Sequence, residues 1–324
     1  MSDYSKKDCI KQAQFIKAEY LAGKRQKAAE PAPEAPTLSE AIDSYIAKRS
    51  NALSPATIRG YRIIQRNRFK DDMPRRLNEI RDDEWQGIVN REAGMCSPKT
   101  LKNAWGFIRS VVEDATGRYP PEVTRPAATP PNKLFLTPDQ IKVFVPAISE
   151  TPFAIPALLA LSSLRISEIT ALDWQNIPPK PKFIRVSGAA VLDEHNQMVK
   201  KRQNKNATST RNVPIMIPEL AVALERERKT AGPVMPYGQS CLRHAIHKIC
   251  VEHDLPEVGV HGLRHSFASL AYHLQMPEKI AMEIGGWADA ATMHGIYTHI
   301  AQSDITRYQT AMTEFYSTTG HQEC

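Results

Sequence analysis

The stretch VHGLRHSFASL, residues 260 to 270, places two histidines and an arginine within five positions. On a helix, His261, Arg264 and His265 stand at i, i+3 and i+4 and share one face of the first turn. A helix N-terminus already presents unpaired N–H groups and a partial positive charge. A guanidinium and an imidazole added there predict an anion site, best suited to a phosphate or a carboxylate.

The alternative for the two histidines is a metal-binding pair at i and i+4. The residues between them are Gly-Leu-Arg, without the glutamate expected of a zinc-protease helix, and Arg264 would repel a cation. A further alternative is that these polar side chains are simply solvated at the protein surface. The sequence therefore favours an anion site, and we predict neither a metal ion nor a cofactor.

Two other stretches carry polar residues in notable company. Arg165, in SSLRISEI, follows an apolar helical run, and Glu168 three residues later can pair with it or with another base nearby. The stretch GGWADAATMHGIYTH, residues 285 to 299, joins a glycine pair and Trp287 to Tyr297 ten residues later. Taken alone, these indicate a structural Arg–Glu pair and a packed or surface tyrosine.

Composition limits the classes of protein that could hold such a site. The chain has 324 residues, which is room for two domains, and its 42 Lys+Arg against 35 Asp+Glu suit a polyanionic partner. Its five cysteines are scattered, which argues against a disulfide framework or a zinc ribbon. Without a long apolar run or a signal core, we expect no membrane span and a cytoplasmic location.

Two stretches rich in proline or alanine indicate linkers, AGKRQKAAEPAPEAP and YPPEVTRPAATPPNK. Proline removes an amide donor and restricts the residue before it, so helices and central strands are disfavoured there. The predicted organisation is an N-terminal helix and linker at 1–36, a helical domain at 37–118, a proline-rich linker at 119–133 and a last domain at 134–324.

The segment 37–118 is predicted to be all helical. TLSE at Thr37 is a capping box, and SPAT and SPKT each put serine at an N-cap and proline at N1. Arg59, Arg62 and Arg66 share one face of the helix after SPAT, and no acid lies between Arg59 and Lys70. The ion pairs that usually cover such a face are therefore expected to be missing, and we expect phosphate contacts there rather than a merely solvated face.

The last domain is predicted to be mainly α with a small antiparallel β-sheet. Residues 155–172 form a mostly apolar helical stretch, while KFIRVSGAAVLD and TRNVPIMI are rich in Val and Ile and predict strands. Between these strands lies the polar stretch EHNQMVKKRQNKNATS, and the pattern after residue 218 is helical again.

In this order and spacing, LRISEI, HGLRH, GGW and YTH resemble the tyrosine site-specific recombinases, the phage-integrase family. The resemblance covers most of residues 37–318. It implies a helical, SAM-like core-binding domain and a mixed α/β catalytic domain that clamp DNA between them.

Matched to the family's motifs, Tyr297 stands at the nucleophile, and Arg165 and Arg264 stand at the two arginines that bind the scissile phosphate. His261 matches the first histidine of the His-x-x-Arg motif. Glu168 matches a residue that supports the site, and we place His265 beside it as a second supporting residue.

Two assignments are less direct. The family uses a hairpin lysine that precedes an Arg-x-Val-Pro strand, and this spacing selects Lys205, with Lys200 and Lys201 as rivals. Trp287 stands where histidine is usual, which favours an indole N–H donor to the phosphate over a proton-transfer role.

The resemblance implies an integrase of a mobile element that works at the nucleoid through a covalent 3′-phosphotyrosine. A DNA-binding regulator with the same fold and a type IB topoisomerase-like enzyme are the alternatives. The expected partners are double-stranded DNA, further copies of the chain in a tetramer on paired sites, and accessory DNA-bending or directionality factors. The expected DNA contacts are Arg59, Arg62, Arg66, Lys200, Lys201, Arg202 and Arg211.

Overall fold

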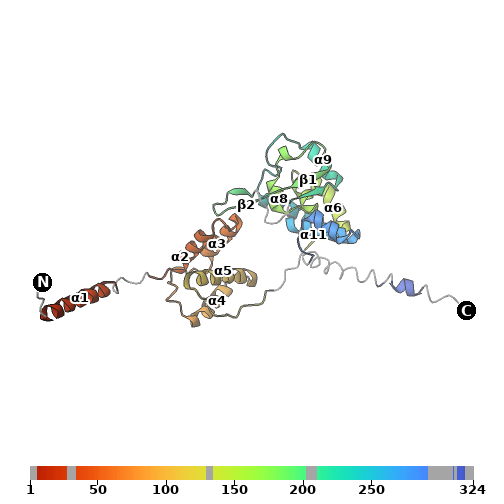
Figure 1. Cartoon of the computed structure of the whole chain (residues 1–324). Helices are drawn as coiled ribbons and strands as arrows, with labels where there is room; N and C mark the ends of the chain where they lie inside the picture. Colours follow the sequence, from red (N-terminus) through yellow and green to blue (C-terminus); the bar gives the residue numbers. More distant parts are fainter. Residues whose placement is uncertain are drawn as a thin grey trace. The chain divides into compact units, whose positions relative to one another are not determined.

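A computed structural model of the chain describes residues 6–27, 34–128, 134–201, 210–290, 309 and 312–317. The chain divides into two compact units, Met1–Thr129 and Pro130–Cys324, and the division falls inside the proline-rich stretch 119–133. Both units are mainly helical, and the strands of the described ranges lie in the second (Figure 1). No helix in these ranges is long and apolar enough to cross a membrane.

The first unit is built from helices that begin where the sequence places their caps. Thr37 forms the predicted capping box with Glu40, and Ser54 and Ser97 each accept a hydrogen bond from the backbone N–H three residues on. The elements are α1 (Lys6–Lys27), α2 (Leu38–Arg49), α3 (Pro55–Asn67), η1 (Asp82–Glu84), α4 (Trp85–Ala93) and α5 (Pro98–Thr116).

The core of this unit lies between α2, α4 and α5. Trp85 and Trp105 meet at a centroid distance of 5.5 Å, and Tyr61 from α3 stacks on Phe107 at 3.8 Å. Burial of each such side chain stabilises the fold by about 1.5–3 kcal/mol. The core therefore fixes α3 and leaves Arg66 on its exposed side.

The second unit is centred on α7, whose eight residues are all buried. It packs against α6, α9 and α11, so the apolar run predicted at 155–172 forms the middle of the core. The helices are α6 (Pro138–Ser149), α7 (Ala154–Leu161), α8 (Ile166–Ala171), η2 (Trp174–Asn176), α9 (Pro218–Arg226), α10 (Gln239–Glu252), α11 (Val260–His273) and α12 (Glu278–Gly285).

The strands form two antiparallel pairs rather than one sheet. Strand β1 (Phe183–Val186) pairs with β4 (Arg211–Pro214), and β2 (Ala189–Leu192) pairs with β3 (Met198–Lys201). The fold class expected from the sequence is thereby confirmed, and β3 lies in the polar stretch between the two predicted strand regions. Only its pairing with β2, which packs against α8, makes it a strand.

The chain leaves α7 through a turn that prepares the site. The N–H of Leu164 bonds the carbonyl of Leu159 at 3.0 Å, and the N–H of Ser163 bonds that of Ala160 at 3.0 Å. This is the Schellman arrangement, in which the residue after the cap takes the left-handed conformation and is usually glycine. Here that residue is Ser163, with φ of 80°, a conformation that costs a non-glycine residue about 1–2 kcal/mol.

Candidate functional site

Arg165 stands at the N-cap of α8 and binds Glu168, the acid three residues on. Its backbone N–H donates to Oε2 of Glu168 at 2.8 Å, and its Nη1 donates to Oε1 at 2.8 Å. The motif LRISE therefore closes on itself, because the Glu168 carboxylate accepts from both the backbone and the side chain of the N-cap arginine. The side chain of Arg165 stays 37% exposed, while its backbone is fixed at the start of α8 by the hydrogen bond to Glu168.

The same carboxylate holds a second arginine, Arg211 of β4. Nη1 and Nη2 of Arg211 each donate to one oxygen of Glu168 at 3.0 Å. Burial alone would raise the pKa of Glu168, but the hydrogen bonds and charge of Arg211 and the contacts from Arg165 outweigh it, so this pKa is lowered. Glu168 is thus an anion that anchors two guanidinium groups.

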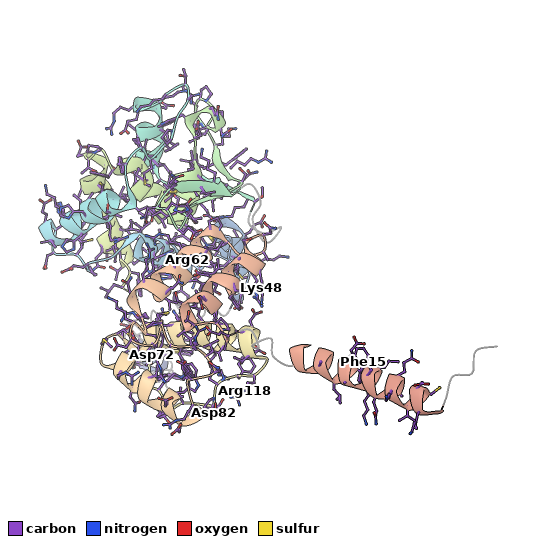
Figure 2. The ribbon with its side chains drawn as sticks, turned by 90° about the vertical axis from the view of Figure 1, so that its left-hand side faces the viewer. Phe15, Lys48, Arg62, Asp72, Asp82 and Arg118 are labelled. Carbon is purple, nitrogen blue, oxygen red and sulfur yellow. The ribbon has the colours of Figure 1, made fainter. Side chains whose placement is uncertain are left out.

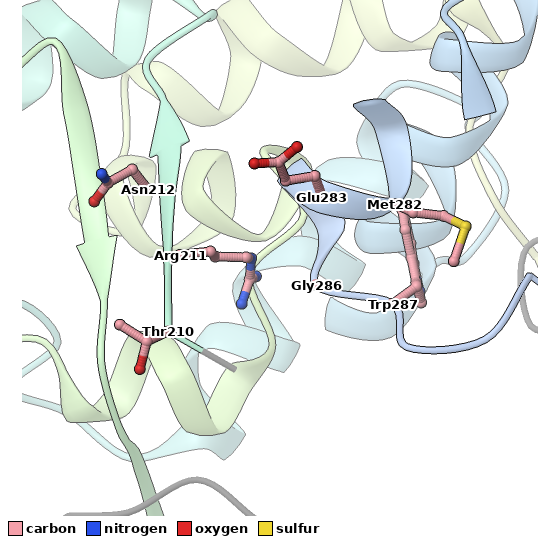
Figure 3. A pocket seen from close by; sticks show the side chains of 7 residues that line it. All are labelled: Thr210, Arg211, Asn212, Met282, Glu283, Gly286 and Trp287. Carbon is pink, nitrogen blue, oxygen red and sulfur yellow. The ribbon is translucent and has the colours of Figure 1, made fainter. Parts of the chain in front are cut away.

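Arg211 also ties β4 to the end of α12. Its Nε donates to the carbonyl of Ile284 at 2.8 Å, and Figure 3 shows its side chain extending from β4 toward Gly286. Arg211 was expected among the exposed DNA contacts, but it is only 8% exposed, and its donors face Glu168 and two carbonyl groups. These hydrogen bonds hold its guanidinium within the protein, which indicates a structural place for Arg211.

The glycine pair before Trp287 is explained by close contacts. Gly286 has φ of 62°, and a Cβ there would lie 2.8 Å from Cζ of Arg211. A Cβ on Gly285 would lie 2.1 Å from the ring of Trp287. The carbonyl of Gly286 accepts a hydrogen bond from Nη2 of Arg165 at 2.8 Å, so the turn joins both arginines. A pocket of about 490 Å³ opens beside it, lined by Thr210, Arg211, Asn212, Met282, Glu283, Gly286 and Trp287 (Figure 3).

Arg264 lies in the interior between the α7 turn and Trp287. Its Nη1 donates to the carbonyl of Ser163, and its Cζ lies 4.5 Å from the centroid of the Trp287 ring. Trp287 in turn stacks on Phe267 at 6.0 Å. Nη2 of Arg264 is buried and finds no hydrogen-bond acceptor among the described residues. That nitrogen belongs to a charged group and is able to donate a hydrogen bond to a ligand.

The electrostatics of the site favour an anion. Burial and the nearby positive charges of Arg165 and Arg211 lower the pKa of Arg264 to about 9, which still leaves its guanidinium charged at pH 7. Arg264 experiences the charges of two further arginines and of one carboxylate, Glu168, so positive charge is in excess. An anion bound here would offset that repulsion and gain charge-assisted hydrogen bonds.

The two histidines of the motif lie in different surroundings. His261, in the first turn of α11, is exposed, and His265 is half-buried. Loss of solvent around the imidazole, and then the charges of Arg264 and Arg165, lower the pKa of His261. His261 is therefore neutral at pH 7 and able to accept a proton. Among the described residues no group of His, Cys, Asp and Glu is arranged to hold a metal ion.

The comparisons with known proteins agree with this geometry. A family model described as the phage integrase family matches residues 135–304, which is more than half of the chain. The chain belongs to the phage integrase family. No curated protein matches the sequence.

Solved structures of integrases share the fold of this family member. The Tn1549 transposon integrase in complex with circular intermediate DNA superposes with a TM-score of 0.61 at 20% identity, over 84% of this chain and 100% of that one. A lambda integrase dimer bound to a COC′ core site gives a TM-score of 0.52 at 16% identity, over 81% and 95%. At these identities the likeness shows the fold.

Several site residues expected from the integrase motifs lie outside the described ranges, namely Tyr297, Lys205 and Arg202. Lys201 ends β3, and Lys200 lies in the same strand with its Nζ 3.8 Å from Oδ2 of Asp173. Because β2 packs against α8, this hairpin stands beside the helix that Arg165 begins.

The basic face of α3 differs from its expectation in one respect. Nη1 of Arg62, labelled in Figure 2, pairs with Asp43 of α2 and donates to Gln65 at 2.9 Å. Arg66 is exposed, and its Nε donates to the carbonyl of Arg62 at 3.2 Å. The expectation that ion pairs are missing from this face is therefore wrong for Arg62, because the acid comes from another helix.

The sequence did not indicate the structural roles of two residues that shape the site. Ser163 and Arg211 both contact residues far along the chain, and neither lies on a periodic stripe. The only local signals were a serine pair that interrupts an apolar helix and an arginine that opens a Val-Pro strand.

Proposed function

We propose that this chain is a site-specific DNA recombinase, the integrase of a mobile element. It cleaves and rejoins DNA strands through a covalent 3′-phosphotyrosine on Tyr297. The observation that carries the proposal is the cluster of positive charge formed by Arg165, Arg211 and Arg264, in which one buried guanidinium nitrogen of Arg264 lacks an acceptor within the described chain. A scissile phosphate would supply that acceptor.

The chemistry requires the charges that this cluster offers. Attack on a phosphodiester builds negative charge on the equatorial oxygens, and two guanidinium groups stabilise it in fork geometry. Ionising a tyrosine of ordinary pKa at pH 7 costs about 4 kcal/mol. The two arginines lower that cost, and the neutral imidazole of His261 can accept the phenolic proton. In this proposal the arginines supply the positive charge, and no metal ion or cofactor takes part.

The step balances without an external energy source. The Tyr297 oxygen bonds to phosphorus while the bond from phosphorus to the 5′-oxygen breaks, and the ammonium of Lys205 gives that oxygen a proton. Lys200 and Lys201 remain the rivals for this role. The phosphotyrosine keeps the bond energy, so a 5′-hydroxyl of another strand can reverse the reaction and complete the exchange.

Double-stranded DNA is the proposed partner, held mostly through its backbone. Arg59, Arg62 and Arg66 on α3 and the basic hairpin, with Lys200, Lys201 and Arg202, are the proposed contacts, whereas Arg211 is not. Exchange between two sites implies a tetramer, with accessory DNA-bending or directionality factors, in the cytoplasm at the nucleoid.

A suicide substrate tests this function. A nicked duplex drawn from the DNA that flanks the gene is incubated with the parent and with Tyr297→Phe, and covalent adducts are resolved on a denaturing gel. We expect an adduct and strand transfer with the parent, and unchanged DNA binding without an adduct for Tyr297→Phe. An adduct without strand transfer, together with relaxation of a supercoiled plasmid that carries the same site, would indicate a topoisomerase. Absence of any adduct would indicate a regulator. An adduct that survives in Tyr297→Phe would move the nucleophile to Tyr308 or Tyr316.

A further inference from the structure

Ser163 has a backbone conformation that suits glycine better than serine. It is fully buried, and its φ of 80° closes the turn after α7. A glycine would meet the same hydrogen bonds of that turn with less strain. What serine adds to the turn is a Cβ and a hydroxyl, so the reason for serine should lie in what that hydroxyl contacts.

Two polar atoms of Ser163, its carbonyl oxygen and its hydroxyl Oγ, contact arginines of the site. The carbonyl accepts from Nη1 of Arg264 and, at 3.5 Å, from Nη2 of Arg211. The hydroxyl Oγ lies 3.3 Å from Nη1 of Arg264. A carbonyl oxygen has two lone pairs, and the left-handed turn directs them out of the row of helix carbonyls toward the two guanidinium groups.

The contacts divide the guanidinium of Arg264 into a held side and an open side. Ser163 takes Nη1, and the ring of Trp287 covers one face at 4.5 Å. Nη2 is left without an acceptor among the described residues. Because a guanidinium is planar and rigid, holding Nη1 fixes the direction in which Nη2 points.

We propose that Ser163 is a positioning residue for Arg264, whose carbonyl and hydroxyl hold Nη1 so that Nη2 is directed at the scissile phosphate. This inference rests on the proposed function and adds the residue that sets the geometry of one phosphate-binding arginine. Ser163 itself touches no reacting atom.

Two substitutions separate the hydroxyl from the backbone. Ser163→Gly removes the hydroxyl and relieves the strain, while Ser163→Ala removes the hydroxyl and keeps a Cβ at positive φ. Gln275→Gly is the matched control, since Gln275 is exposed, has φ of 53° and contacts none of the site's arginines in the described structure. Each variant is measured for Tm, for DNA affinity and for the single-turnover rate of adduct formation on the suicide duplex.

For Ser163→Gly we expect a Tm equal to or higher than that of the parent and a DNA affinity within about twofold of the parent's. Adduct formation should be slowed by about tenfold or more, which is the loss expected for a hydrogen bond to a charged group. Ser163→Ala should lose the same rate with a lower Tm than Ser163→Gly. Gln275→Gly should cleave at the parent's rate. A merely structural role would move rate and Tm together, so the opposite directions in Ser163→Gly are the diagnostic result.

An unchanged rate in Ser163→Gly would overturn the inference, as would a fall of rate and Tm together. If the parent forms no adduct, the proposed function fails by itself. Crystal structures of the parent and of Ser163→Gly then decide the point, because the inference requires the Arg264 guanidinium to turn, so that Nη2 points elsewhere, when the hydroxyl is lost. An unmoved guanidinium would refute it.

Discussion

Arg165 and Arg211 bind one carboxylate, that of Glu168, and both also bind the chain around the end of α12. Arg165 reaches the carbonyl of Gly286 at 2.8 Å, and Arg211 reaches that of Ile284 at 2.8 Å. The guanidinium of Arg165, which is proposed to bind phosphate, is therefore positioned by Glu168. Glu168 in turn forms a buried ion pair with Arg211 of β4. A change at Glu168 should consequently act on stability and on catalysis together.

Glu168→Gln is expected to destabilise the second unit by about 3–5 kcal/mol, because it leaves the buried Arg211 without a counter-charge. Urea unfolding followed by far-UV circular dichroism measures this change. Glu283→Gln is the control, because Glu283 is an exposed acid in the pocket that Arg211 also lines. This variant should shift the unfolding midpoint little. Equal midpoints for the two variants would show that the ion pair does not stabilise the unit.

The lowered pKa of Glu168 predicts how stability changes with pH. A carboxyl whose folded pKa lies below its ordinary value of 4.5 contributes stability that is complete above that value and is lost as the pH falls through the folded pKa. The free energy of unfolding of the parent should therefore fall on acidification from pH 5. Since other acids titrate there too, the measured quantity is the difference from Glu168→Gln, which should shrink toward low pH. A difference in unfolding free energy between the parent and Glu168→Gln that does not change with pH would contradict a lowered pKa of Glu168.

Gly286→Ala should cost more stability than Gly117→Ala, although both glycines have positive φ. At Gly117, with φ of 75°, a Cβ meets open space, so the cost is the left-handed strain of about 1–2 kcal/mol. At Gly286 the Cβ would lie 2.8 Å from Arg211, whose guanidinium is held by Glu168 and cannot yield freely. Thermal unfolding compares the two, each on the transition of its own unit. A larger loss at Gly117 would show that Arg211 moves aside easily.

Trp287 is expected to act on the site through its ring face. Trp287→Ala removes a buried ring and should cost about 3–5 kcal/mol in stability. Trp287→Phe keeps an aromatic face beneath Arg264, and Trp287→His keeps an N–H donor with less ring surface. Single-turnover adduct formation should be retained better by the Phe variant than by the His variant, because the Arg264 guanidinium lies over the ring at 4.5 Å. The reverse order would favour indole N–H donation to the phosphate.

Arg66→Ala should weaken DNA binding at every sequence and lower the slope of log affinity against log salt by about 1, as for the loss of one phosphate contact. Arg66 is exposed on α3. Arg81→Ala is the matched control, because Arg81 is also exposed in the first unit, beside Asp83, and is not among the proposed contacts. Fluorescence anisotropy with a labelled duplex from 50 to 300 mM salt gives both slopes. Equal slopes for the parent and Arg66→Ala would remove Arg66 from the DNA interface.

Features that depend on neighbours in the chain were determined by the sequence itself. The caps at Thr37, Ser54 and Ser97 involve residues three positions apart, so their geometry is local and all three were predicted correctly. The family and the fold class were also identified from motif order and composition. The pairing of Arg165 with Glu168 belongs here too, since i and i+3 meet on one turn.

Other features were decided by the tertiary structure. The ion pair of Arg211 with Glu168, the pairing of β3 with β2, the ion pair of Arg62 with Asp43 and the hydrogen bond from Arg264 to Ser163 each join residues from different elements. No local period marks such contacts, because a side chain's partner and its exposure depend on which segments the core brings together. Whether an arginine meets solvent or a buried carboxylate is settled only when that core forms.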